Sequence, residues 1–191
     1  MQFAELPHCT HDLIMLRPLV SADLQPWFDY LSQPEVFEHT SWNLQSVDEL
    51  APYITGDAPA SPSSRLRLAI ALRSSGELVG TAGFHTVSPE HRSAEIAYDL
   101  ARSMWGKGIA SHVCAALTGW AHAQAGVVRV QATTLESNER SCKVLERCGY
   151  RREGMLRSYR MVRGRPGDFF MYSHLASPPS GTGGPAPDGK P

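Results

Sequence analysis

Two glycines in alternation form a turn with the chemistry to hold an anion. The segment Trp105–Ser111 reads Trp-Gly-Lys-Gly-Ile-Ala-Ser and lies between an expected strand and an expected helix. Glycine lets the backbone come close to a ligand, while the first amides of a helix and the positive end of its dipole attract negative charge. Gly106 and Gly108 therefore form a candidate phosphate-binding turn, although the same pattern also occurs in ordinary tight turns.

Two other phosphate motifs are excluded by counting along the same segment. A Walker A loop requires glycine where the chain has Ala101, and serine or threonine where it has Gly108. A dinucleotide fingerprint requires glycine at Ser111 and follows the first strand of a βαβ unit, whereas this turn follows several strands. Neither of these nucleotide-binding motifs is present.

A second polar segment, Thr134–Ser141, lies at the start of the next expected helix. With Asn138 as the N-cap, Ser141 follows three residues later, so both polar groups lie in the first turn. Plain helix capping is the alternative interpretation. Because two strand-to-helix turns of a mixed sheet can face one ligand, we place both segments in one candidate site.

Hydrophobic periodicity predicts the elements that would position these two turns. In chain order the patterns favour a strand at 12–18, helices from 21 and at 46–54, strands at 65–72, 77–85 and 95–100, a helix at 107–124, a strand at 127–134, a helix at 138–148 and strands at 151–162 and 169–175, with a turn at 164–167. The first strand is apolar on both faces, which predicts a buried position and not a sheet edge. The three strands from residue 65 have short connections, which predicts an antiparallel meander.

The length and composition fit one domain. The 191 residues are 42% apolar, which is enough for one well-filled core. We expect a single domain over residues 1–176 and a disordered tail over 177–191, because the tail has no large apolar residue to bury. The chain shows no targeting pattern and no apolar run near the ~20 residues of a membrane span, so a soluble, cytoplasmic protein without a membrane partner is expected.

Neither a metal site nor a disulfide is expected. The string His8-Cys9-Thr10-His11 contains metal-ligating residue types, but it precedes the first strand and has no second ligand cluster at a usable spacing. The four cysteines form no CxxC pair, and Cys142 and Cys148 share one expected helix at a spacing that is poor for a bridge. Reduced thiols are therefore expected.

The net charge of -1 hides an uneven distribution. Residues 1–139 carry 8 basic and 15 acidic residues, whereas residues 140–165 carry 9 basic and 2 acidic residues. One side of a single folded domain would then attract an anion and the other a cation. A solvated basic hairpin is the alternative, and an RNA-docking face at Arg140–Arg165 is a further one.

Taken together, these segments resemble the GNAT acetyltransferases, and within them the branch that acetylates the N-termini of ribosomal proteins. The family's pyrophosphate loop, Arg/Gln-x-x-Gly-x-Gly/Ala, is similar to Trp105–Ala110, with Trp105 in the Arg/Gln position as is common in that branch. Its second signature, Asn before a helix and Gly-Phe/Tyr after it, is similar to Asn138 through Gly149-Tyr150. Matches to that branch extend over roughly Leu13–Leu175 and include Ala94–Leu100, Glu153-Gly154 and Gly164–Tyr172.

The resemblance implies an α/β (α+β) fold with a mixed, strongly twisted central sheet of about seven strands and helices on both faces. The sheet would splay between the Glu95 strand and the Val127 strand, with the pantetheine arm of acetyl-CoA in the gap. Acetyl-CoA is thus the implied acetyl donor, and no metal is implied. The implied cofactor-binding residues are Leu100, Arg102, Trp105, Gly106, Lys107, Gly108, Ile109, Ala110, Ser111, Asn138 and Ser141.

The implied reaction is direct attack of a neutral primary amine on the thioester, without an acyl-enzyme. Glu95 is the candidate base, acting through one water, because family members often carry a carboxylate on that strand; an exposed residue paired with an arginine is the alternative. Ser141 is the candidate acid toward the departing thiolate, with Tyr98 or Tyr150 as alternatives. Asn138 would orient acetyl-CoA or Ser141.

The resemblance favours a protein or peptide N-terminal α-amine as acceptor, as in ribosomal-protein acetylation. Near neutral pH an α-amine loses its proton at a cost of about 0.5 kcal/mol, against about 4 kcal/mol for a lysine. A small-molecule amine, such as a polyamine or an aminoglycoside, is the first alternative, and a non-catalytic CoA-binding module is the second. A monomer and a homodimer are both compatible with the sequence, and nucleic acid is expected as a partner only through ribosome association.

Overall fold

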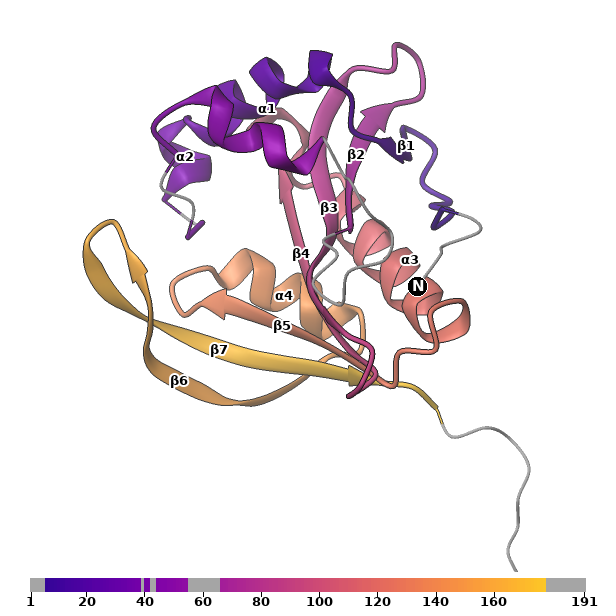
Figure 1. Ribbon diagram of the computed structural model, residues 1–191, viewed down its shortest axis with the longest axis vertical. Helices are drawn as coiled ribbons and strands as arrows, with labels where there is room; N and C mark the ends of the chain where they lie inside the picture. The colour runs from indigo at the N-terminus through magenta and orange to yellow at the C-terminus, as the bar shows by residue number, and fades with distance from the viewer. Residues whose placement is uncertain (1–5, 39, 42–43, 55–65, 178–191) are drawn as a thin grey trace, which may run out of the picture.

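Seven strands and the helices between them follow one another in the order expected from the sequence (Figure 1). The computed structural model describes residues 6–38, 40–41, 44–54 and 66–177. The strands are β1 (Ile14–Pro18), β2 (Leu66–Leu72), β3 (Leu78–Ser88), β4 (Ser93–Leu100), β5 (Arg129–Leu135), β6 (Arg151–Val162) and β7 (Arg165–Leu175). The helices are the 3-10 helix η1 (Ser21–Asp23), α1 (Leu24–Leu31), α2 (Pro34–Phe37), the 3-10 helices η2 (Val47–Tyr53) and η3 (Arg102–Met104), α3 (Ile109–Ala123) and α4 (Glu139–Arg147).

The strands form one mixed sheet in the order β1-β2-β3-β4-β5-β7-β6. Neighbouring strands are antiparallel except β4 and β5, which run parallel. The parallel pairing covers only Ser93–Glu95 and Arg129–Gln131, and the strands then diverge, so that β2–β4 and β5–β7 form the two arms of a V (Figure 1). The expected meander and the mixed, splayed α/β sheet are confirmed.

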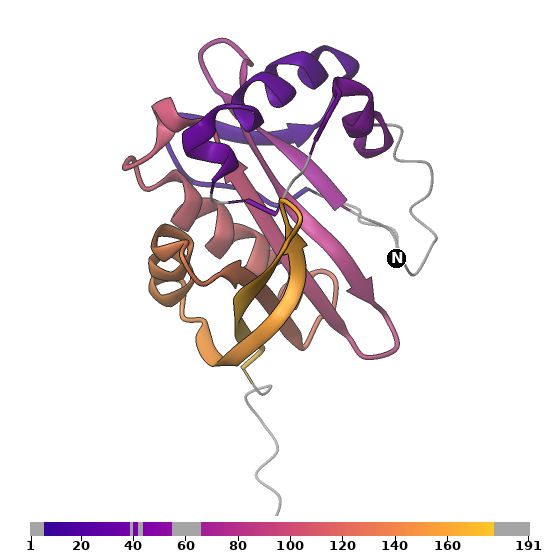
Figure 2. The same ribbon diagram turned by 90° about the vertical axis from the view of Figure 1, so that its left-hand side faces the viewer.

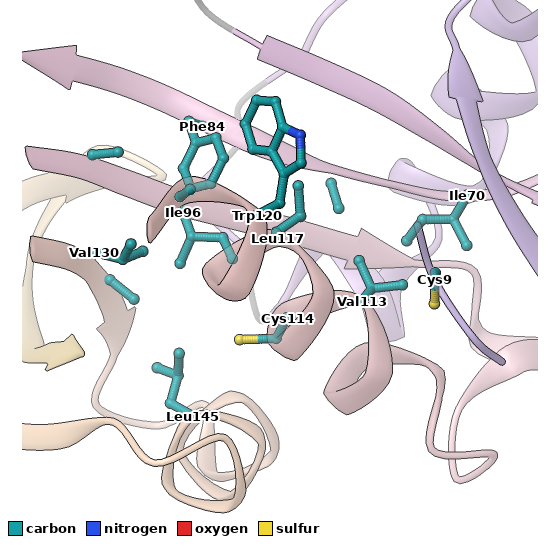
Figure 3. Close-up of a cluster of buried hydrophobic side chains, with 14 of the residues drawn as sticks. Cys9, Ile70, Phe84, Ile96, Val113, Cys114, Leu117, Trp120, Val130 and Leu145 are labelled. Atoms are coloured by element: carbon teal, nitrogen blue, oxygen red, sulfur yellow. The ribbon is translucent and has the colours of Figure 1, made fainter. Parts of the chain in front are cut away.

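Helices cover both faces of this sheet. Neighbouring residues of β2 show this, because Ala69 belongs to the hydrophobic cluster of α1 while Ile70 belongs to the cluster of α3. In Figure 3, Leu117 and Trp120 of α3 point toward Phe84 of β3, and the Trp120 and Phe84 rings stack with centroids 6.3 Å apart. The α3 cluster therefore fixes the helix that follows the Gly106 turn against the strands that precede it.

The first strand differs from the sequence expectation. β1 lies at the edge of the sheet and pairs with β2 alone in the described sheet. Ile14 is fully buried, whereas Leu13, just before the strand, is 49% exposed. The prediction of a buried strand away from the edge is wrong, because an apolar pattern reports which side chains can be covered and not whether another strand pairs alongside.

The closing hairpin is also longer than expected. Its turn is the two-residue Arg163-Gly164, and both residues have positive φ, as a two-residue hairpin turn of this kind requires. β7 therefore begins at Arg165, and Pro166 lies inside the strand opposite Met161 instead of in the turn.

The described part of the chain was compared with the expectations for a membrane span, a metal site and a disulfide. There, no helix is long and apolar enough to cross a membrane, and no group of three or more histidine, cysteine or acidic residues is placed to hold a metal ion. The four cysteines are free, with Cys9 and Cys114 buried and Cys142 and Cys148 half-buried. Almost all of the expected disordered tail lies outside the described residues, so the tail and the domain boundary stay predictions.

Close packing of β2 against β3 makes Gly83 a sensitive position. A Cβ atom at Gly83 would lie 1.8 Å from the Leu66 carbonyl oxygen, whereas one at Gly119 in α3 would have no neighbouring atom within 4 Å. We expect Gly83→Ala to destabilise the fold by about 2 kcal/mol through overpacking of backbone. The matched control Gly119→Ala should stabilise it by about 0.5 to 1 kcal/mol through helix propensity. Urea unfolding measures both, and equal free energies of unfolding would contradict the packing at Gly83.

Candidate functional site

The turn before α3 has the geometry of an anion site. Gly106 and Gly108 have positive φ values of 77° and 78°, a conformation that favours glycine, and Gly108 is the N-cap of α3. The helical ladder begins with Ser111 and His112, whose amides donate to the Gly108 carbonyl at 3.1 and 3.2 Å. By helix geometry the amides before them have no partner in the ladder, and the positive end of the dipole lies there.

The turn before α4 has the capping arrangement expected from the sequence. The Asn138 side-chain oxygen accepts a hydrogen bond from the Ser141 amide at 3.1 Å, and the Asn138 carbonyl accepts one from the Cys142 amide at 3.2 Å. The predicted N-cap is therefore confirmed. Because Asn138 organises the first turn of α4, it also fixes the position of Ser141.

A cleft of about 660 Å³, here called the Gly106 cleft, opens between these two turns. Every residue expected from the sequence to bind the donor lines this cleft except Lys107. The Lys107 ammonium instead lies 3.6 Å from the Met104 sulfur, and the Lys107 carbonyl lies 3.0 Å from the His11 Nε2. A direct contact of the Lys107 side chain with a ligand in this cleft thus finds no support.

Basic side chains surround the Gly106 cleft. The Arg140 guanidinium lies over the Trp105 ring, 4.4 Å from its centroid, and the Trp105 indole N–H donates to the Leu100 carbonyl at 2.9 Å. Cation–π contact of this kind holds a guanidinium at a ring while leaving its edge able to bind an anion. The helical part of the basic segment therefore lies at the candidate phosphate site, through Arg140, Lys143 and Arg147, together with Arg102.

A second cleft of about 760 Å³, here called the His85 cleft, adjoins the first. Residues from β4, the α2–η2 connection and the start of α4 line both clefts, namely Thr40, Tyr98, Asp99, Asn138 and Ser141. The two clefts therefore meet in the gap between β4 and α4. A molecule in one cleft and a molecule in the other would come together beside Tyr98 and Ser141.

A buried hydroxyl in the wall of the His85 cleft favours a ligand in the gap. Thr134 of β5 is 5% exposed, and its Oγ1 has no hydrogen-bond partner among the described residues. A buried unpaired hydroxyl costs about 1 to 3 kcal/mol, so a polar group of a bound molecule would stabilise this position. With the glycine turn and the cations of the Gly106 cleft, the residues present fit a long ligand with phosphates at one end, as acetyl-CoA has.

Glu95 lies behind the wall of the His85 cleft and is 5% exposed. Its Oε1 accepts from the Thr133 hydroxyl at 2.7 Å and from Arg160 Nη2 at 3.2 Å, and it lies 3.1 Å from His85 Nε2. Burial alone would raise the pKa of Glu95, but the bonds from His85 and Thr133 and the charges of His85 and Arg160 lower it to about 2. Glu95 is thus a permanent anion at neutral pH and a weak proton acceptor.

A second buried carboxylate, missed in the sequence, lies at the junction of the clefts. Asp99 accepts hydrogen bonds from Tyr30 and Arg67 and from the Thr81 hydroxyl at 2.9 and 3.0 Å. Burial and the Asp99 charge raise the pKa of Tyr30 well above its usual value. The four residues come from α1, β2, β3 and β4, so no local pattern signals this network.

The two tyrosines considered as alternative acids differ in position. Tyr98 lines both clefts, and burial raises its pKa well above the usual value, so its phenol keeps its proton and can donate a hydrogen bond. The Tyr150 hydroxyl lies 2.7 Å from Thr118 Oγ1, deep in the α3 cluster, and lines neither cleft. Of the two, only Tyr98 is positioned beside Ser141.

The tip of the β6–β7 hairpin joins the two arms of the sheet. The Arg163 guanidinium donates to the carbonyls of Phe37, Thr40 and Glu38 at 3.0, 3.2 and 3.2 Å. These carbonyls belong to the C-terminal end of α2 and the residues after it, where a cation is favourable. Figures 1 and 2 show the hairpin reaching toward the α1–α2 end of the molecule. The hairpin thereby closes one side of the His85 cleft.

Comparisons with known proteins agree on one family. A family model described as an acetyltransferase (GNAT) domain matches residues 14–151. The chain is 32% identical over 164 residues to an N-acetyltransferase, YoaA, of Bacillus subtilis (strain 168), a match that covers 85% of this chain and 93% of YoaA.

Two solved structures extend this result to the fold. RimJ of Mycobacterium smegmatis, in complex with CoA-disulfide, is 26% identical with a TM-score of 0.74, over 88% of this chain and 85% of RimJ. Spermidine N-acetyltransferase of Vibrio cholerae, in complex with CoA and spermine, is 20% identical with a TM-score of 0.75, over 86% of this chain and 96% of that enzyme. The second likeness shows the shared fold alone.

Substitution of Gly108 should weaken binding of acetyl-CoA. At ~100 times its dissociation constant the ligand should add about 2.7 kcal/mol, which raises Tm by roughly 5 to 11 °C for a domain of this size. We expect Gly108→Val to lose most of this rise, because a β-branched residue is strained at positive φ and fills the Gly106 cleft. Thermal unfolding with and without acetyl-CoA measures it.

Gly76→Val is the matched control for this experiment. Gly76 has a φ of 74° in the turn between β2 and β3, and it lines neither cleft. Its variant should lower the Tm of the free protein and keep the full rise with acetyl-CoA. The assignment of the turn would be wrong if Gly108→Val kept the full rise as well.

The basic face of α4 should contribute to donor affinity. Arg140→Gln is expected to raise the dissociation constant of acetyl-CoA about tenfold, the size expected for loss of one charge-assisted contact. Arg151→Gln is the control, because Arg151 is an exposed residue of β6 that lines neither cleft. Calorimetric titration with acetyl-CoA at one salt concentration measures the dissociation constants of the two variants. Equal constants would show that Arg140 is not part of the phosphate site.

Proposed function

The chain belongs to the GNAT family of acetyl-CoA-dependent N-acetyltransferases, and on this premise we propose that it acetylates the α-amine of a protein or peptide N-terminus. The observation that carries the proposal is the junction of the two clefts beside Tyr98 and Ser141. A donor in the Gly106 cleft and an amine in the His85 cleft meet there, as direct transfer within a ternary complex requires. The ribosomal-protein type of acceptor rests on the sequence resemblance to that branch.

The candidate group that donates a proton to the departing thiolate lies at the start of α4. Ser141 lines both clefts, and Asn138 holds the turn that carries it. We assign to Ser141 the proton donated to the departing thiolate and to Asn138 the positioning of Ser141. Tyr98 is the second candidate for this proton, since its phenol stays protonated and lines the same junction.

On the acceptor side, the reaction needs a neutral amine. An α-amine with a pKa of about 7.8 is partly neutral near pH 7.4, so its base has to supply little driving force. Glu95 was expected to serve as this base through a water, and its position next to the His85 cleft supports a part in handling the proton. With a pKa of about 2, Glu95 stays ionised at neutral pH, and Arg160 and His85 lie against its charge.

The charges of the His85 cleft favour an acceptor with one amine over a polyamine. Asp99 is bound by Arg67, and Glu95 by Arg160. Glu49 accepts the amides of Gln45 and Ser46 at 2.7 and 3.0 Å at the start of η2. A polyamine needs several carboxylates that are free to pair with its charges, whereas the first residues of a peptide need only space for one amine and a polar chain.

An amine screen with a free-thiol readout tests the acceptor. We expect CoA release with a short peptide that begins with free alanine or serine. The same peptide with a blocked N-terminus and an internal lysine should react at least about 100-fold more slowly, because its amine is rarely neutral near pH 7. Release of CoA with spermidine alone would overturn the peptide acceptor, and no release with any amine would overturn the transferase activity.

The same assay tests the acid. Ser141→Ala should reduce turnover of the reactive peptide by about 100-fold while the acetyl-CoA thermal shift persists. Ser137→Ala is the control and should retain wild-type turnover, because Ser137 is an exposed residue of the turn before α4 and lines neither cleft. Undiminished turnover in Ser141→Ala would assign the proton to another donor, and Tyr98, which lines the same junction, is the second candidate.

A further inference from the structure

A β-bulge in β3 places His85 and Thr86 together on the side of the acceptor cleft. β3 pairs Phe84 with Ile96 and then Thr86 with Glu95, which leaves His85 as the extra residue between them. Successive side chains of a regular strand point to opposite faces, whereas Phe84 and Val87 both pack in the α3 cluster and the two residues between them, His85 and Thr86, both line the His85 cleft. Bulges re-aim side chains in this way and often lie next to active sites.

The hydrogen bonds of His85 determine which nitrogen can accept a proton. Nε2 lies 3.1 Å from Glu95 Oε1, and an ionised carboxylate only accepts hydrogen bonds, so Nε2 carries a proton. In the neutral ring the lone pair is then on Nδ1, which lies 3.0 Å from the Thr86 hydroxyl. His85 Nδ1 therefore faces the hydroxyl of Thr86, an exposed residue at the cleft, while Glu95 supports the opposite side of the ring.

The accessibility of the two candidate bases also differs. The His85 side chain is 32% exposed and the Glu95 side chain 6% exposed, and only His85 lines the cleft. The charged groups packed around the ring are Glu95 from β4 and, on the same carboxylate oxygen, Arg160 from β6. β5 contributes the neutral Gln131 and Thr133, which also bond Glu95. The Glu95 carboxylate is thus shared by His85, Arg160 and the two neutral residues of β5.

We infer that His85 is the group that accepts the proton of the acceptor amine and that Glu95 is its positioning residue, an assignment that rests on the proposed acetyl transfer. The ammonium loses one proton to Nδ1 by way of the Thr86 hydroxyl or one water. The freed lone pair of nitrogen forms the C–N bond while the C–S bond breaks. The departing thiolate takes up the proton of its acid, Ser141. A second proton of the nitrogen then replaces that proton on Ser141. The products are the amide, free CoA thiol and one proton released from His85 to solvent.

A pH series on His85→Gln and His85→Asn tests this inference. At pH 7 we expect kcat with the peptide acceptor to fall about 100-fold, within the usual range for a lost general base. The defect should shrink to less than about threefold near pH 9.5, because the α-amine is then already neutral. A defect that stays constant with pH in both variants, or loss of the acetyl-CoA thermal shift in both, would overturn the inference, since either result describes a structural role.

Two further variants complete the experiment. His91→Gln is the matched control, because His91 is an exposed histidine in the turn between β3 and β4, and it should keep wild-type kcat at every pH. Glu95→Gln should reduce kcat without adding its full effect to that of His85→Gln, because the two residues act as one unit. If the two substitutions lowered kcat by fully additive free energies, the pairing of His85 with Glu95 would be overturned. Wild-type protein that acetylates no amine refutes the proposed function itself, whereas wild-type activity with an unaffected His85→Gln refutes only this assignment.

Discussion

The short parallel contact between β4 and β5 is the constraint on which the rest of the structure depends. Three residue pairs hold the two strands together, and the strands separate after Glu95 and Gln131. Had the ladder continued, the sheet would be closed, and neither cleft would reach Tyr98. Because the strands separate, the edge of β4 and the buried hydroxyl of Thr134 face a gap in which a bound ligand would supply the missing polar partner.

The gap has to be held open, and packing on both sides does this. α3 is fixed to the strands of one arm through Trp120 and Phe84, and the hydroxyl of Tyr172, on the other arm, donates to Glu146 of α4 at 3.1 Å. Arg163 then ties the end of the hairpin to the carbonyls after α2. The starts of α3 and α4 thereby converge on the Gly106 cleft without filling it, so two helix dipoles point at one place.

Electrostatics divides the site into two halves. On the acceptor side each buried carboxylate is neutralised by an arginine from another strand, Asp99 by Arg67 and Glu95 by Arg160, because an unpaired buried charge would be strongly destabilising. On the donor side Arg140, Lys143 and Arg147 of α4 line the cleft, and the carboxylate that pairs with Lys143 there is the exposed Glu139. The uneven charge along the sequence thus becomes a difference between two neighbouring clefts.

The sequence alone determined the features that depend on residues close together in the chain, within one helical turn or one repeat of the strand pattern. The positive φ of Gly106 and Gly108, the bond from Ser141 to Asn138, the amphipathic α3 and the meander of β2–β4 are local, so residue type and spacing specify them. The likeness to one family then indicated the splay. Other features depend on which strands pair and in which register, and a single sequence does not contain that information.

The tertiary structure decided the edge position of β1, the pairing of Asp99 with Arg67 and the burial of Glu95 behind His85. It also decided which basic residues lie at the donor cleft and which lie on the hairpin. The bulge at His85 is one extra residue in a ladder, and it places two successive side chains, His85 and Thr86, on the cleft side. The chemistry of the acceptor side therefore follows from contacts between residues 85, 95, 133 and 160, which only the folded sheet brings together.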